Sequence, residues 1–421
     1  MRFWLGVMPL FAMAQLASAQ TATEYPPIKA IVYAGNSVTR EITMQRELVI
    51  AVGEPADPER IDRSRQAIQD LGLFREVSVR QEAQDDGVRV IFTVREKWYV
   101  LPIPRIEANS DGDTGLGMQI RWDNVWGLNH SLSALAVRRD YQREDKDSSY
   151  NYHFDYNIPF LRGTRNSLAF SASHSKQTST TLEGDDYQES NEGFSVVMTH
   201  SLNKDGPPSQ GWKVGGGLLW KSQTSSGEFA PEPEGSATGL IGKVSYNDVH
   251  DHIYSLTGER FLANISGSWD QLLSDYSYLG YYAQYRRYMH VGQVEHQSLH
   301  FLADVGGYHA GPLSREPKAF ELGGSGMLRG YDREVIEGDF MYYGSVEYLR
   351  PIHWDWLRLL TLFEAGSALR DVDYPSNEIV YASVGVGLRM QITWFVNLQF
   401  EIGVAYPLVS GNQVRFFAGA F

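Results

Sequence analysis

Residues 394–406 read Trp-Phe-Val-Asn-Leu-Gln-Phe-Glu-Ile-Gly-Val-Ala-Tyr, and the chain closes on Phe421. Apolar and polar residues alternate with period two through this stretch. The apolar face holds Val396, Leu398, Phe400, Ile402, Val404 and Tyr406, and the opposite face holds Asn397, Gln399, Glu401 and Gly403. Residues 380–390 repeat the pattern. Alternation of this kind, ending on an aromatic residue, is typical of an outer-membrane β-barrel, whose strands face lipid on one side and a lumen on the other.

The composition agrees with a barrel exported from the cytoplasm. Arg2 precedes an apolar run at 3–16, and Ala17-Ser18-Ala19 follows, so residues 1–19 read as a cleaved signal peptide. No later stretch reaches the roughly 20 apolar residues that a spanning helix needs. The chain has no cysteine, which excludes disulfides, thiolate nucleophiles and cysteine metal sites. A formal net charge of −14 argues against a nucleic-acid partner.

Residues 26–96 have a different pattern, that of a small α+β module. The expected order is a strand at 28–33, a short helix at 39–48, a helix at 58–71 and two strands at 76–80 and 87–94. Asp57 is placed to cap the longer helix and Gly72 to end it. About 70 residues of this kind can bury a modest core.

From residue 98 to 421 the helical pattern disappears, and about 16 antiparallel strands are expected, an even number as in bacterial single-chain barrels. A long break interrupts them at about 309–337. Hairpin loops are usually far shorter, so this one needs a reason.

The break contains Phe-Glu-Leu-Gly-Gly-Ser-Gly-Met-Leu-Arg-Gly-Tyr at 320–331. Gly323 and Gly324 permit tight folding, and the apolar residues prefer burial, so we expect the loop to fold into the barrel. Arg329 then needs an acidic partner in the lumen. Alternation in the strand at 357–368 turns Glu364 inward. The other interpretation is a disordered external loop whose arginine meets only water.

Leu328-Arg329-Gly330-Tyr331 resembles the signature of POTRA-barrel outer-membrane proteins of the BamA/TamA type. The N-terminal module is similar to a single POTRA domain. The resemblance implies that the signature lies on the loop between barrel strands 11 and 12, where the strand count also places it. It further implies that members insert or export polypeptides through a lateral gate in the barrel.

The resemblance also implies a partner for Arg329 on strand 13, in a Phe/Tyr-x-Asp-x-Gly setting. The matching stretch is Leu362-Phe-Glu-Ala-Gly366, in which Glu364 replaces the aspartate and Leu362 the aromatic residue. Glu347 on strand 12 is an alternative partner. Asn247-Asp248 and Asp251 resemble the family's acidic turn between strands 8 and 9, or are simply solvated turn residues.

Pro102 and Pro104 flank Ile103 in the first expected strand. Proline cannot donate to a ladder, so it favours an edge or a bulge. The final strand, which contains Gly419 and Phe421, would be the neighbour at that edge, and Arg415 stands where outward parity with Phe417 predicts an apolar residue. We expect a lateral seam that opens and templates an incoming strand. The alternative is that the prolines mark a linker.

The N-terminal module offers a second edge for extended polypeptides. The strand at its side comprises Glu76, Val77, Ser78, Val79 and Arg80. Main-chain pairing there is largely independent of sequence, which suits many clients and leaves room for periplasmic chaperones or accessory proteins. A single module, where assembly-complex members have several, argues against docking of multiple accessory lipoproteins.

Enzymatic readings find little support. His250-Asp251-His252 invites a metal, but a polar turn explains it as well and no third ligand is evident. No nucleophile, base and orienter converge, and no cofactor is expected. The sequence therefore predicts a Gram-negative outer-membrane protein that assists insertion or translocation of polypeptides. The alternative is a passive porin-like channel whose selectivity is set by inward Arg389, Glu401 and Asp304.

Overall fold

The computed structural model describes residues 25–108, 114–140, 148–180, 186–230, 235–310, 320–324, 326–332, 336–369 and 379–420. The expected signal peptide and Phe421 lie outside these ranges. None of the helices in the described ranges has the length and apolarity required to cross a membrane.

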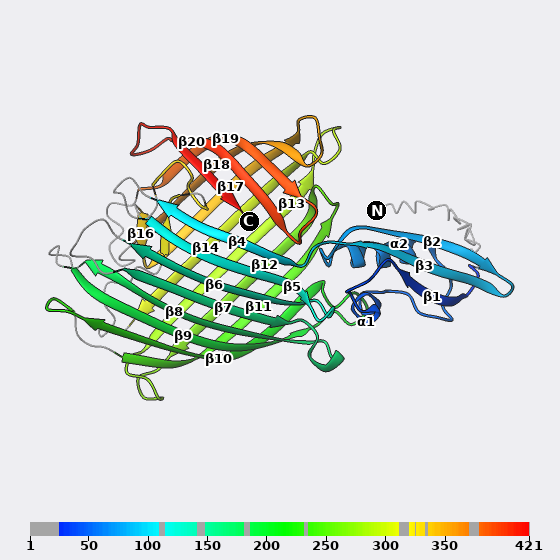
Figure 1. Cartoon of the computed structure of the whole chain (residues 1–421), viewed down its shortest axis with the longest axis horizontal. Coiled ribbons are helices and arrows are strands. Elements are labelled where there is room, and N and C mark those ends of the chain that lie inside the picture. The colour runs from blue at the N-terminus through cyan, green and yellow to red at the C-terminus, as the bar shows by residue number, and fades with distance from the viewer. Residues whose placement is uncertain are drawn as a thin grey trace, which may run out of the picture.

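The N-terminal domain is the α+β module expected from the sequence (Figure 1). Its elements are β1 (Ile28–Ala34), α1 (Glu41–Gln45), α2 (Pro58–Gln69), β2 (Phe74–Gln84) and β3 (Gly87–Glu96). The sheet order is β1-β3-β2, with β1 parallel to β3 and β2 antiparallel to it. The Asp57 side chain accepts a hydrogen bond from Glu59 N and so caps α2. Gly72, at φ +70°, turns the chain after α2.

The second body is a β-barrel made from one 16-stranded antiparallel sheet, which confirms the predicted fold and strand number (Figure 1). Its strands are β4 (Val100–Ala108), β5 (Thr114–Val125), β6 (His130–Asp140), β7 (Ser149–Ile158), β8 (Asn166–Thr180), β9 (Asp186–Ser201), β10 (Gly211–Ser226), β11 (Gly235–Asp251), β12 (Leu256–Ser268), β13 (Tyr278–His290), β14 (Ser298–Ala310), β17 (Phe340–Pro351), β18 (Leu357–Leu369), β19 (Tyr381–Ile392), β20 (Leu398–Pro407) and β21 (Arg415–Ala420). Each pairs with the next, and β4 and β21 are the two ends of the sheet.

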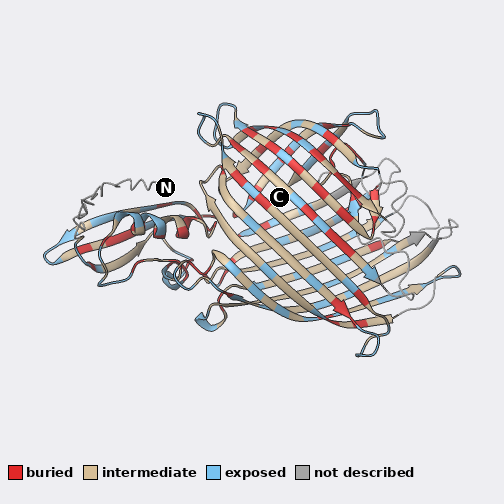
Figure 2. Ribbon diagram, turned by 180° about the vertical axis from the view of Figure 1, so that it is seen from behind, coloured by how far each residue is buried: buried red, intermediate tan, exposed pale blue. Residues whose placement is uncertain are grey.

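Burial alternates along the strands, as the period-two pattern predicts (Figure 2). On β20, Phe400, Ile402 and Val404 are exposed on the outer surface, whereas Glu401 is buried inside. Buried inward side chains are concentrated on the wall formed by β17–β20. Something must therefore fill the lumen against this wall.

The N-terminal domain rests on one end of the barrel, which we call the proximal rim (Figure 1). Gly127, in the turn between β5 and β6, accepts hydrogen bonds from Arg40 N (2.9 Å) and from the Thr43 hydroxyl (2.7 Å). A Cβ on Gly127 would stand 2.1 Å from the carbonyl oxygen of Val38, and its φ is +72°. This turn therefore needs glycine for close backbone contact.

Candidate functional site: an inward-folded loop and the free sheet edges

The described part of the loop between β14 and β17, the eleventh and twelfth barrel strands, lies in the lumen. Two short strands, β15 (Phe320–Leu322) and β16 (Ile336–Gly338), pair at its base. The apolar residues of the loop are buried against the barrel wall. They are Leu322, Leu328, Tyr331 and Ile336, which pack on Met341 and Tyr343 of β17. The expectation of an inward loop thus agrees with the structure, and burial of these side chains is what stabilises the fold-back.

A tight turn presents the arginine of this loop. Leu328 has φ 51°, a strained conformation for a side chain that is fully buried. Gly324 N donates to the Tyr331 carbonyl (2.9 Å), and Tyr331 N donates to the Leu328 carbonyl (3.0 Å). A Cβ on Gly330 would lie 2.7 Å from Ser383 Cβ. The glycine therefore lets the turn press against β19.

Arg329 meets the predicted partner, Glu364 of β18. Its Nη1 lies 3.0 Å from Glu364 Oε1, and its backbone N donates to Glu364 Oε2 at 2.8 Å. Both residues are at most 5% exposed. The Tyr343 hydroxyl (2.7 Å) and the Ser383 hydroxyl (3.1 Å) donate to the same carboxylate. The longer Glu in place of Asp thus still reaches the loop.

Glu347, proposed as an alternative partner, binds Arg329 as well. Arg329 Nη2 donates to Glu347 Oε1 at 2.8 Å. Arg389 of β19 bridges the other Glu347 oxygen (2.8 Å) and Glu401 of β20 (2.6 Å). Arg329 Nε also lies 3.2 Å from Glu401 Oε1, within ion-pair distance but without hydrogen-bond geometry. The arginine therefore joins carboxylates from three strands. The sequence analysis had offered Glu364 and Glu347 as alternatives and had not connected Glu401 with Arg329.

Tyr331 fixes the other end of the motif. Its hydroxyl lies 2.8 Å from the Ala382 carbonyl of β19 and 2.6 Å from the Val409 carbonyl beyond β20. A hydroxyl has a single proton, so it donates to one of these oxygens at a time. The motif is thus tied to the last quarter of the barrel, next to β21.

The orientation expected for β21 was wrong. Phe417, predicted to face outward, is 2% exposed and lies in the lumen with the Arg329 guanidinium 5.5 Å from its ring centre. Phe416 faces out instead and is 68% exposed. Arg415 therefore does not disturb an apolar face, because it pairs with Asp332 of the loop at 2.7 Å. In a short strand with aromatic residues at two consecutive positions, alternation does not show which of the two faces lipid.

β4 and β21, the strands expected to flank a seam, are the two ends of the sheet. No ladder joins β4 to β21 in the described part of the chain. The β4–β5 ladder runs from Val100 to Ala108 through both prolines. Pro102 and Pro104 are exposed and Ile103 is half-buried. Being two residues apart, the prolines lack an N–H on the same edge of β4. Gly419 pairs with Glu401, and the final Phe421 lies outside the described residues.

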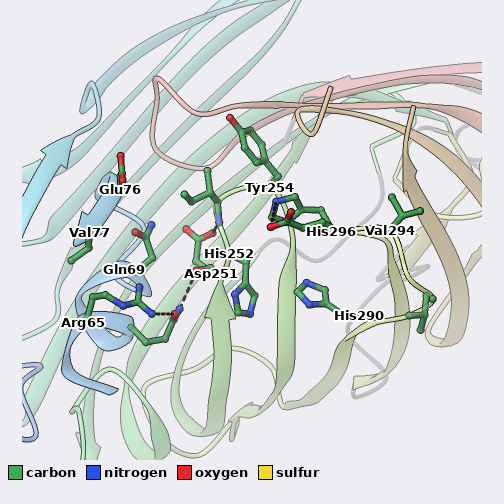
Figure 3. A pocket seen from close by; sticks show the side chains of 15 residues that line it. Arg65, Gln69, Glu76, Val77, Asp251, His252, Tyr254, His290, Val294 and His296 are labelled. Carbon is green, nitrogen blue, oxygen red and sulfur yellow. Dashed lines mark hydrogen bonds and ion pairs between the residues drawn. The ribbon is translucent and has the colours of Figure 1, made fainter. Parts of the chain in front are cut away.

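β2 lies at one edge of the N-terminal sheet, as predicted, and β1 lies at the other. Glu76, Val77, Ser78, Val79 and Arg80 lie on β2. Glu76 and Val77 line a cavity of about 480 Å³ between this domain and the proximal rim. Figure 3 shows side chains of α2 and β2 on one side of the cavity. The turns after β11 and β13, with His252, His290 and His296, form the other side.

The junction between the domains was missed by the sequence analysis. Asp70, at the end of α2, accepts hydrogen bonds from Gln210 Nε2 (2.9 Å), Asp251 N (2.8 Å) and His250 Nδ1 (2.8 Å). Asp251 is thus a docking residue instead of a solvated turn residue, and His250-Asp251-His252 has a structural role. No group of His, Cys, Asp or Glu within the described ranges has an arrangement that could hold a metal.

Two carboxylates of the N-terminal domain are electrostatically unusual. Burial raises the pKa of Glu47 to about 7, although the Ser209 hydroxyl of the β9–β10 turn donates to it at 2.6 Å. Burial also acts to raise the pKa of Glu96, but hydrogen bonds from Ser37 and Thr39 outweigh it and hold the pKa at about 2. Glu47 is therefore a proton-sensitive contact between the domains, whereas Glu96 stays charged.

Comparison with known proteins gives two family matches. A model described as the Omp85 superfamily domain matches residues 124–420, and the POTRA model, described as surface antigen variable number repeat, matches residues 26–97. No curated protein matches the sequence.

Solved structures share the fold at low identity. CdiB from Escherichia coli is 14% identical with a TM-score of 0.62, over 94% of this chain and 77% of that one. CdiB from Acinetobacter baumannii is 13% identical with a TM-score of 0.60, over 94% and 73%. BamA from Haemophilus ducreyi lacking POTRA domains 1–3 is 16% identical with a TM-score of 0.55, over 94% and 85%.

Proposed function

Because this chain belongs to the Omp85 superfamily, with one POTRA domain before its barrel, we propose that it inserts or translocates polypeptides at the seam between β4 and β21. It is an integral outer-membrane protein. In the proposed orientation the POTRA domain faces the periplasm and the Arg329 loop enters the lumen from the cell exterior. The proposal needs no enzymatic step and no cofactor, since strand pairing itself supplies the free energy.

The unpaired sheet ends carry the proposal. A barrel normally removes both edges by closing, and exposed edges are ready templates for pairing. Here β21 has only six residues, and β4 contains two prolines. Few main-chain hydrogen bonds would be lost if these ends separated, so an incoming strand competes against a weak partner.

The loop site supports the same proposal by holding the wall next to the seam. Arg329 joins β17, β18 and β20, and Phe417 of β21 lies beneath its guanidinium. If the seam opens by movement of β21, that strand therefore moves relative to a wall that the Arg329 contacts hold rigid. Arg329 and Tyr331 position the wall, and no part of our proposal has them touch the client.

The POTRA edge supplies a first docking place. Backbone groups of β2 that face away from β3 are available to an extended polypeptide. This edge leads into the cavity at the proximal rim, where Glu76 and Val77 face the barrel turns. Clients would therefore already be in an extended conformation when they reach the barrel.

The second candidate is a passive channel, for which inward charges are the supporting observation. Arg389, Glu401 and Asp304 do face inward, but each of them is already paired with a side chain of opposite charge. Arg389 binds Glu401, and Asp304 binds Arg286 at 2.6 Å. A porin would also have no use for the POTRA domain.

Reconstitution distinguishes the two candidates. Liposomes with the purified chain should increase the yield of folded, heat-modifiable barrel proteins from urea, relative to empty liposomes and to liposomes with Arg329→Ala. A channel would instead give solute flux and single-channel conductance, with equal folding yields in all three samples. That second result would reject the proposal.

A further inference from the structure

An exposed apolar patch continues from the barrel onto the POTRA domain. It comprises Trp126 of the β5–β6 turn, Val38 of the segment that leads into α1, and Ile42 of α1. Their exposed fractions are 65%, 53% and 41%. Large apolar side chains on a soluble domain normally find cover, so a patch of three needs an occupant.

The patch is rigidly attached to the barrel rim. Arg40 N and the Thr43 hydroxyl both donate to the Gly127 carbonyl, on either side of Ile42. Asn124 Nδ2 donates to the Thr39 hydroxyl at 2.8 Å. The patch therefore cannot swing away from the rim without breaking these contacts.

The patch is continuous with the lipid-facing surface. On β5, Leu116, Met118 and Ile120 are 64%, 46% and 45% exposed on the outer side of the barrel. Trp122 follows on the same side of the strand, and its ring centre is 5.8 Å from that of Trp126. Tryptophan favours the membrane–water interface, so this pair marks the level at which hydrocarbon gives way to headgroups.

We propose that Val38, Ile42 and Trp126 rest on the phospholipid leaflet at the POTRA side of the membrane, so that lipid holds the POTRA domain at the rim. Arg40, exposed beside them, adds a cation at the level of the lipid phosphates. Glu41 and Gln45, also exposed on α1, keep one side of the helix in water. Contact is therefore interfacial and shallow.

Fluorescence quenching by brominated lipid tests this contact, since the natural chain has no cysteine and each substitution adds a single thiol. Val38→Cys and Ile42→Cys in the full chain are labelled with bimane and reconstituted in phosphatidylcholine liposomes with or without brominated acyl chains. The matched control is Val52→Cys, another exposed valine (62%) of the POTRA domain. Val52 precedes Gly53, whose backbone N donates a hydrogen bond to the Ile28 carbonyl. Ile28 is at the end of β1 that is far from the barrel. Leu116→Cys is the positive control.

We expect brominated lipid to reduce emission from Val38→Cys, Ile42→Cys and Leu116→Cys and to leave Val52→Cys unchanged. Exposed side chains are replaced in every case, so folding is preserved. Quenching of Leu116→Cys alone would overturn the inference. Neither result depends on client insertion, so this test and that of the proposed function fail independently.

Discussion

Replacing Arg329 by alanine should release the inward loop. The substitution removes the cation that is paired with Glu364, a carboxylate with no exposed surface, and leaves it the backbone N–H of residue 329 and the hydroxyls of Tyr343 and Ser383 as hydrogen-bond donors. Glu347 and Glu401 keep Arg389. Removing one partner from a buried ion pair costs about 3–5 kcal/mol. At about 1.4 kcal/mol per tenfold change, the population of undocked loop should rise by between roughly 10²-fold and a few thousand-fold.

Thiol labelling measures that population. Leu322→Cys places one thiol at a position that is 1% exposed, and its labelling rate reports how often the loop leaves the lumen. We expect slow labelling in the Arg329 background and a large increase with Arg329→Ala. Arg286→Ala is the matched control, because Arg286 is also buried in the lumen but forms its ion pair with Asp304, away from the loop. Equal labelling rates with Arg329 and with Arg329→Ala would refute the view that this arginine holds the loop.

Other substitutions test the packing and the domain junction. Gly330→Ala, whose new Cβ would stand 2.7 Å from Ser383 Cβ, should also raise the loop labelling rate, and an unchanged rate would show that the turn can yield. Asp70→Asn removes the charge that holds the POTRA domain at the rim. The distribution of distances between spin labels at position 52 and on the β13–β14 turn should therefore become broader. With the pKa of Glu47 raised to about 7, its contribution to docking is complete below about pH 4.5 and is lost as pH rises through 7. The same distances should therefore broaden with rising pH, and Glu47→Gln should remove that dependence; broadening on acidification would contradict the sign.

Much of the fold was predictable because alternation on a barrel is imposed on every strand. One face of each strand must meet lipid, so a one-residue error would place charges such as Glu401 in hydrocarbon. The same rule turned Glu364 and Glu347 inward before any contact was known. The helix cap at Asp57 was readable for a similar reason, since its signal is local.

The remaining features depend on contacts between distant segments. Asp70 and Asp251 are ordinary turn residues in sequence, and only the docking of α2 on the rim makes them partners. Whether Arg329 would bind one carboxylate or several could not be decided, because strand order was known but the depth of the loop was not. Phe417 was misplaced because two adjacent phenylalanines satisfy either parity.

The most direct test of the seam is photo-crosslinking in cells from Ile103, with Val197 on β9, remote in the sheet from both ends, as the control position. The account predicts that a photoreactive residue at 103 captures nascent barrel proteins or a secreted polypeptide, while the same residue at 197 does not. Crosslinks from 103 only to β21 or to lipid, under conditions where a known assembly factor captures its clients, would contradict a working lateral gate.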